Sequence, residues 1–84
     1  MEYPIGCVVK SAAGRDSERF FVVLDTDGEF ALIADGRLRK VEKPKRKKFK
    51  HLRRTNTVVD PEQITTNKRV RQALRGFNES ETIR

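Results

Sequence analysis

The fold is decided by residues 5–36, IGCVVKSAAGRDSERFFVVLDTDGEFALIADG, which hold most of the strand-forming sequence and two glycine-containing turn signals. Apolar runs of strand length lie at residues 5–10, 20–24 and 30–33. Between the second and third runs, Asp27-Gly28 favours the positive φ angles of a two-residue hairpin loop. The stretch therefore predicts three successive antiparallel strands.

With Asp27 and Gly28 as the loop, the predicted hairpin is apolar on both faces. The facing pairs would be Leu24 with Ala31, Val22 with Ile33 and Phe20 with Asp35 on one side, and Val23 with Leu32 and Phe21 with Ala34 on the other. A hairpin of this kind is typical of a central element that is covered on both sides. We expect another part of the chain to cover the second face.

The connection between the first two strands, residues 11–18, is predicted to turn at Gly14, which adopts positive φ without steric cost, and to present Arg15 at its tip. Around it stand Gly6-Cys7-Val8-Val9, Ser11, Ala13-Gly14-Arg15-Asp16, Arg19 and the apolar run 20–24. These residues resemble the KOW motif, a strand-loop-strand unit of ribosomal proteins and transcription elongation factors.

Two further segments extend this resemblance. Residues 31–36, ALIADG, are similar to the third strand and turn of the large-subunit ribosomal protein fourteen-e family, and residues 70–74, VRQAL, to a helix segment that follows its barrel. Over residues 5–77 the chain thus resembles bacterial KOW-domain RNA-binding proteins related to that family. The resemblance implies an SH3-like barrel, RNA as the ligand rather than DNA, and a loop around Gly14 that touches the RNA.

A chain of 84 residues with 36% hydrophobic residues can bury one small barrel and one packed helix. We expect a mainly β single domain, with an SH3-like (KOW) barrel of about five strands over residues 1–60 and a C-terminal helical segment over residues 61–84. The remaining strands are predicted near residues 37–41, 48–52 and 55–59, with a loop at 43–45.

The C-terminal segment carries helix signals. Asp60-Pro61 predicts a short helical turn. Val70, Leu74 and Phe77 form one apolar stripe in a helix over residues 68–77, which Thr65, Thr66 or Asn67 can cap and Gly76 can stop. This helix is the predicted cover for the second face of the hairpin or for one end of the barrel. Whether its cations Lys68, Arg71 and Arg75 extend the basic surface or only meet solvent stays open.

Residues 37–54, RLRKVEKPKRKKFKHLRR, form a basic segment with eleven Lys or Arg and one acid, Glu42, which is a net charge of +10. The whole chain carries +7, so the remaining residues are net acidic. Such a segment indicates a polyanionic partner. A solvated tail or a localisation signal is the alternative explanation. Order is favoured by four apolar residues that interrupt the run, namely Leu38, Val41, Phe49 and Leu52.

Nucleic-acid binding follows physically, because clustered cations release the counterions condensed on phosphates. The candidate RNA-binding residues are Lys10, Arg15, Arg19, Arg37, Arg39, Lys40, Lys43, Lys45, Arg46, Lys47, Lys48, Lys50, His51, Arg53 and Arg54. Of the aromatic residues, only Tyr3, Phe49 and His51 are expected to be exposed enough to stack on bases. This favours structured RNA recognised by shape and backbone, such as ribosomal or transfer RNA, and a role in translation in association with the ribosome.

No catalytic constellation is apparent. Cys7 is the only cysteine and His51 the only histidine. The sequence also contains neither of the glycine-rich patterns that bind nucleotide phosphates, GxxxxGK[ST] and GxGxxG. Cys7 lies inside an apolar strand, which predicts a buried, inert thiol. We therefore expect no enzyme activity, no cofactor, no metal site and no small-molecule substrate.

Two other binding classes are compatible with the charge. One is an adaptor barrel that docks on an acidic protein of the translation or transcription machinery; exposed aromatics for a proline-rich ligand are not evident. The other is a membrane surface, which is disfavoured because the chain has no amphipathic anchor helix, no lipidation motif and no apolar stretch long enough to span a bilayer. Without a secretory signal pattern, the expected location is cytoplasmic.

Overall fold

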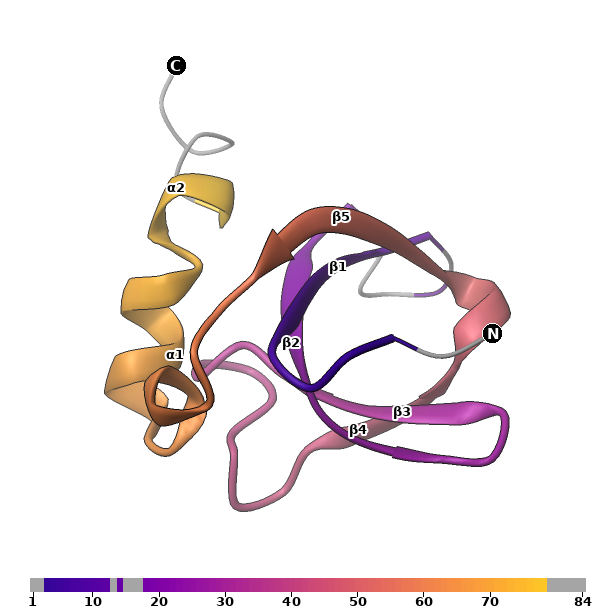
Figure 1. Cartoon of the computed structure of the whole chain (residues 1–84), viewed down its shortest axis with the longest axis horizontal. Coiled ribbons are helices and arrows are strands. Elements are labelled where there is room, and N and C mark those ends of the chain that lie inside the picture. The colour runs from indigo at the N-terminus through magenta and orange to yellow at the C-terminus, as the bar shows by residue number, and fades with distance from the viewer. Residues whose placement is uncertain (1–2, 13, 15–17, 79–84) are drawn as a thin grey trace.

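The computed structural model describes residues 3–12, 14 and 18–78. Its five strands are β1 (Cys7–Ser11), β2 (Phe20–Asp27), β3 (Phe30–Ala34), β4 (Lys45–Lys48) and β5 (Leu52–Val58). They form one antiparallel sheet in the order β4-β3-β2-β1-β5, which curls around its own interior (Figure 1). The mainly β architecture with a C-terminal helix, expected from the sequence, is confirmed.

Short helices complete the described chain. The 3₁₀ helix η1 (Phe49–His51) joins β4 to β5, the two edge strands, and a second 3₁₀ helix, η2 (Pro61–Ile64), follows β5. Two short α-helices, α1 (Asn67–Ala73) and α2 (Arg75–Asn78), then pack outside the curled sheet (Figure 1). None of the helices in the described ranges is long and apolar enough to cross a membrane.

One face of the sheet carries the first apolar cluster. Strands β1, β2 and β3 contribute side chains at alternating positions, and β5 adds its first residue. The buried members are Cys7, Val9, Phe21, Val23, Ala31, Ile33 and Leu52, with Tyr3 and Phe49 packed against them. The predicted burial of Cys7 is thus confirmed, since the residue is fully buried.

The opposite face of the sheet carries a second cluster, which the helices cover. Val8 of β1 and Val22 of β2 are buried against Val70 and Leu74. Phe77 also packs against this cluster, and its ring lies 5.1 Å from that of Phe20. The prediction that an apolar stripe on a C-terminal helix covers the second face of the hairpin is therefore confirmed.

The hairpin between β2 and β3 differs from the prediction in register. The loop is Gly28-Glu29 rather than Asp27-Gly28, because Asp27 pairs with Phe30. A register shift between Val23 and Asp25 then leaves Leu24 as an extra residue, so that Val23 pairs with Ile33. Positive φ occurs at Gly28 (φ 62) and not at Glu29, the pattern of a loop with glycine in its first position.

The predicted strand near residues 37–41 does not form. The carboxylate of Asp35, which is only 2% exposed, accepts hydrogen bonds from the backbone N–H groups of Arg37 and Arg39, each at 2.9 Å. Those N–H groups therefore point at a side chain instead of a neighbouring strand. The next strand is likewise Lys45–Lys48 and not 48–52, which is occupied largely by η1.

The C-terminal helix begins as expected and ends differently. Thr66 is its N-cap and accepts a hydrogen bond from the N–H of Arg69 at 3.1 Å, while Asp60 caps η2 in the same way through Glu62. Gly76 does not stop the helix. It lies inside α2, and the break falls at Leu74, between α1 and α2.

Candidate nucleic-acid interface

The basic segment, residues 37–54, occupies a continuous strip of the molecule. It runs from a loop beside α1 along edge strand β4, around η1 and into the other edge strand, β5 (Figure 1). The cations of the segment therefore lie in the loop before β4, on the two edge strands and in η1.

Seven cations of the segment are exposed: Arg37, Lys40, Lys43, Arg46, Lys50, Arg53 and Arg54. Arg46 is paired with Asp27, at 3.4 Å between Nη2 and Oδ2. Within the described ranges, the other six form no ion pair with a carboxylate. The strip thus carries uncompensated positive charge that a polyanion can neutralise.

The loop at its beginning is held by buried polar contacts. Besides accepting from two backbone N–H groups, Asp35 receives the guanidinium of Arg19, with Nη2 3.3 Å from Oδ2. Arg19 is consequently occupied in shaping the loop. At the other end of the loop, Asn67 of α1 accepts from the N–H of Val41 at 2.8 Å and donates to Glu42 at 2.9 Å. That bond from Asn67 lowers the pKa of Glu42, the one acid of the segment.

Strand β4 sends its side chains to opposite faces of the sheet. Arg46 and Lys48 lie over the half-buried ring of Phe30, with the Arg46 guanidinium carbon 3.7 Å from the ring centroid. Lys47 points the other way and is only 8% exposed; its Nζ donates to the Oγ of Ser11 at 2.8 Å. Lys47 was predicted to bind RNA, but its ammonium is buried, so it cannot meet a phosphate at the surface. We leave it out of the interface.

A second group of cations lies where β1 meets β5. Lys10 and Arg53 are directly opposite each other in the ladder, and Nζ of Lys10 pairs with Oε1 of Glu18 at 2.8 Å. The hydrogen bond and charge of Lys10 lower the pKa of Glu18, with a smaller contribution from Arg53. Lys10 is thus already paired, whereas Arg53 is exposed and available.

The remaining predicted residues differ in position. Lys40, Lys43 and Lys50 are exposed; Arg39, Lys45, Lys48 and His51 are half-buried. Arg54 lies 5.9 Å from the ring of Tyr3 and beside Cys7; burial raises the pKa of this thiol, and Arg54 partly offsets the shift. Arg15 lies outside the described residues.

In the described part of the chain, no group of three or more His, Cys, Asp or Glu could hold a metal ion.

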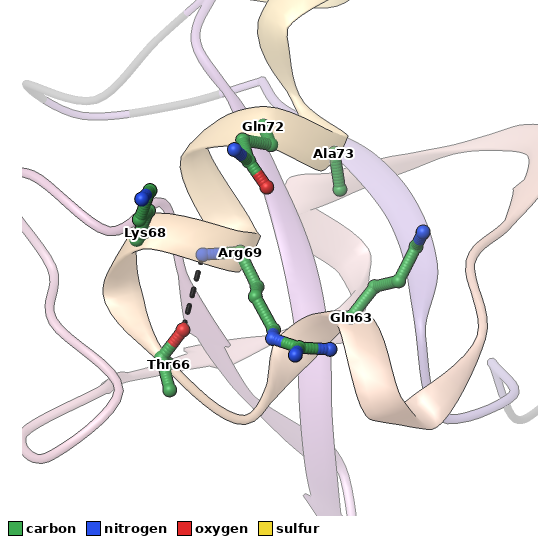
Figure 2. A pocket seen from close by; sticks show the side chains of 6 residues that line it. All are labelled: Gln63, Thr66, Lys68, Arg69, Gln72 and Ala73. Carbon is green, nitrogen blue, oxygen red and sulfur yellow. Dashed lines mark hydrogen bonds between the residues drawn. The ribbon is translucent and has the colours of Figure 1, made fainter.

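Two of the depressions lined by described residues have the volume of a ligand site. One, of about 450 Å³, lies at η2 and α1 and is lined by Ala73 and by polar side chains (Figure 2), namely those of Gln63, Thr66, Lys68, Arg69 and Gln72. The other, of about 440 Å³, lies at the opposite end, between the β2–β3 loop and η1, and is lined by Tyr3, Gly28, Glu29, Lys48, Phe49 and Lys50. Sequence reasoning singled out Tyr3 and Phe49 but missed Gly28 and Glu29, which only the fold brings to them.

On the helices, the side chain of Arg71 makes a structural hydrogen bond, since its Nη1 donates to the carbonyl of Gly36 at 2.8 Å.

Comparison of the sequence with protein-family models and with curated proteins found no match.

Proposed function

We propose that this chain is a non-catalytic RNA-binding protein whose curled sheet is an SH3-like barrel of the KOW type. Its ligand is structured RNA, ribosomal or transfer RNA, and it acts in the cytoplasm in association with the ribosome. The observation that carries the proposal is a set of six exposed cations in the basic segment that form no ion pair with a carboxylate of the described residues: Arg37, Lys40, Lys43, Lys50, Arg53 and Arg54.

The physical basis is counterion release. Each cation that meets a phosphate frees condensed ions, so log K falls with log salt by about 0.9 per contact on a duplex. Six contacts correspond to a slope of about −5. Because the strip is ordered, little conformational entropy is lost when RNA binds, in contrast to a disordered basic tail.

The first experiment measures binding of a structured RNA at several salt concentrations. Replacement of Lys50 and Arg53 by Gln should weaken binding and flatten the salt slope by about 1.8, since two phosphate contacts are lost. The matched control replaces Lys68 and Arg69 by Gln, which removes the same charge from α1 (Figure 2). Equal losses in both variants would indicate a diffuse charge effect and contradict the proposed strip.

A second experiment tests the ligand in cells. Ultraviolet crosslinking followed by sequencing should give reads concentrated on a ribosomal or transfer RNA. If the complex instead survives nuclease treatment at full mass, an acidic protein holds it, and the adaptor alternative replaces RNA binding.

A further inference from the structure

The depression beside η1 combines groups that sequence distance hides. Tyr3 comes from the segment before β1, Gly28 and Glu29 from the β2–β3 loop, and Phe49 from η1. The N–H of Phe49 donates to the carbonyl of Glu29 at 2.9 Å, which anchors η1 to the hairpin loop. The hydroxyl of Tyr3 donates to the carbonyl of Leu52 at 3.3 Å. Hydrogen bonds thus hold both aromatic residues in place.

Its walls are aromatic and its rim is charged. The rings of Tyr3 and Phe49 meet edge to face, with centroids 5.0 Å apart, and both rest against the first apolar cluster. They are only half-buried, so part of each ring faces the depression. Lys48 and Lys50 stand on the rim with a single acid, Glu29. The volume of about 440 Å³ lies within the range of ligand pockets, roughly 300–1,000 Å³.

We propose that this depression, the Tyr3–Phe49 pocket, binds one unpaired nucleobase of the RNA, stacked on the ring of Phe49 beside Tyr3, since the planes of the two rings are inclined by 60°. The two rim lysines then meet the flanking phosphates, and the Glu29 carboxylate accepts a hydrogen bond from an exocyclic amine of the base. Charge complementarity favours a nucleotide over a peptide. A nucleotide presents a flat base between two negatively charged phosphates, which matches an aromatic ring flanked by two lysines. The inference rests on the proposed RNA binding and adds a single-stranded element to it.

The chain supplies its own reporter for this pocket. Tyr3 is its only tyrosine and it has no tryptophan, so its intrinsic fluorescence comes from the proposed site. Titration with a short oligoadenylate should quench this fluorescence more strongly than a fully paired RNA duplex, which can approach Tyr3 only through Lys50 and Arg54 and cannot insert a base. Quenching by an acidic peptide and not by oligoadenylate would overturn the assignment of the occupant.

Variants complete the test. Phe49→Leu keeps apolar contact with the core but removes the ring; it should weaken oligoadenylate binding roughly 5- to 150-fold, the range of one base–aromatic stack, without changing the salt slope or duplex affinity. Phe77→Leu is the matched control, since it removes a ring that packs on the other apolar cluster. It should leave oligoadenylate binding, the salt slope and duplex affinity unchanged. If the chain binds no RNA at all, the proposed function fails; if it binds RNA and Phe49→Leu binds oligoadenylate like the unmodified chain, only the pocket fails.

Discussion

The Nζ of Lys47 lies 2.8 Å from the Oγ of Ser11, on the buried face of the sheet. Two successive lysines of one strand therefore make different contacts. Lys47 forms a hydrogen bond on the buried face, whereas Lys48 reaches the ring of Phe30 and the rim of the Tyr3–Phe49 pocket. Counting charges along the segment overestimates the number of cations that can meet RNA.

Lys47→Ala should lower the free energy of unfolding by about 1–3 kcal/mol, because a buried hydrogen bond to a charged group is lost. Lys48→Ala should change it by no more than about 0.5 kcal/mol. Urea unfolding measures both. RNA affinity should fall more in Lys48→Ala than in Lys47→Ala. If Lys47→Ala instead keeps its full stability and binds RNA poorly, Lys47 contacts the RNA directly.

Asn78 ties the end of the described chain to β2. Its side-chain amide accepts from the N–H of Phe20 at 3.0 Å and donates to the carbonyl of Phe20 at 3.2 Å. Asn78→Ala should cost about 1–2 kcal/mol in the free energy of unfolding and speed hydrogen exchange at the N–H of Phe20. Asn78→Asp keeps an acceptor for that N–H and should retain most of its protection; equal exchange in both variants would argue against this contact.

Gly36 and Gly76 differ in what a methyl group would meet. At Gly36, φ is +80° and a Cβ would lie 2.5 Å from the carbonyl oxygen of Asn67. Gly36→Ala should therefore destabilise the chain by about 1–3 kcal/mol. Gly76 lies in α2 with nothing within 4 Å of a Cβ, so Gly76→Ala should raise the free energy of unfolding by up to about 1 kcal/mol. Chemical denaturation of the two variants tests the contrast in sign.

Glu18 should titrate below the ordinary range of a glutamate, because Lys10 stabilises its charged form. A carboxyl whose pKa is lower in the folded chain adds stability at pH values above its unfolded pKa, about 4.3. This contribution is lost as the pH falls through the folded pKa. NMR titration should show the pKa of Glu18 rising towards normal in Lys10→Gln. The pKa of Glu42 should stay low there, since its partner is Asn67; a shift at both groups would indicate a general change in charge.

The sheet and its cover follow from local patterns. Apolar runs at Phe20 and Phe30 and the glycine between them predict the hairpin, and the spacing of Val70 and Leu74 predicts the helix on its second face. The register could not be derived for two reasons: Gly28 can stand first or second in a two-residue loop, and the extra residue Leu24 in β2 has no signature in the sequence. One inserted residue moves every later pair by one position.

Strand β4 shows where patterns fail. Its sequence, KRKK, has no apolar alternation, yet it pairs with β3 from Phe30 opposite Lys48 to Ile33 opposite Lys45. What places it there is tertiary: the edge of β3 is available, and Ser11, distant in sequence, accepts a hydrogen bond from the buried ammonium of Lys47. Propensity and periodicity contain no information about such a partner.

The sequence predicts the positive charge of the candidate site but not how its residues are arranged. Composition identifies the basic segment, whereas the pairing of Lys10 with Glu18 and of Arg19 with Asp35 depends on contacts between distant parts of the chain. The same holds for the Tyr3–Phe49 pocket, whose lining comes from three separate segments.

The position of β4 at the edge of the sheet has a consequence for the behaviour of the chain in concentrated solution. An edge strand exposes unpaired N–H and C=O groups to which a second copy can add, and like charges facing each other across such a pair oppose it. The Lys and Arg side chains of β4 supply that repulsion at low ionic strength. Salt screens this repulsion, so the high salt that would release a bound polyanion should also lower the barrier to self-association, and dimers should become more frequent as the ionic strength rises.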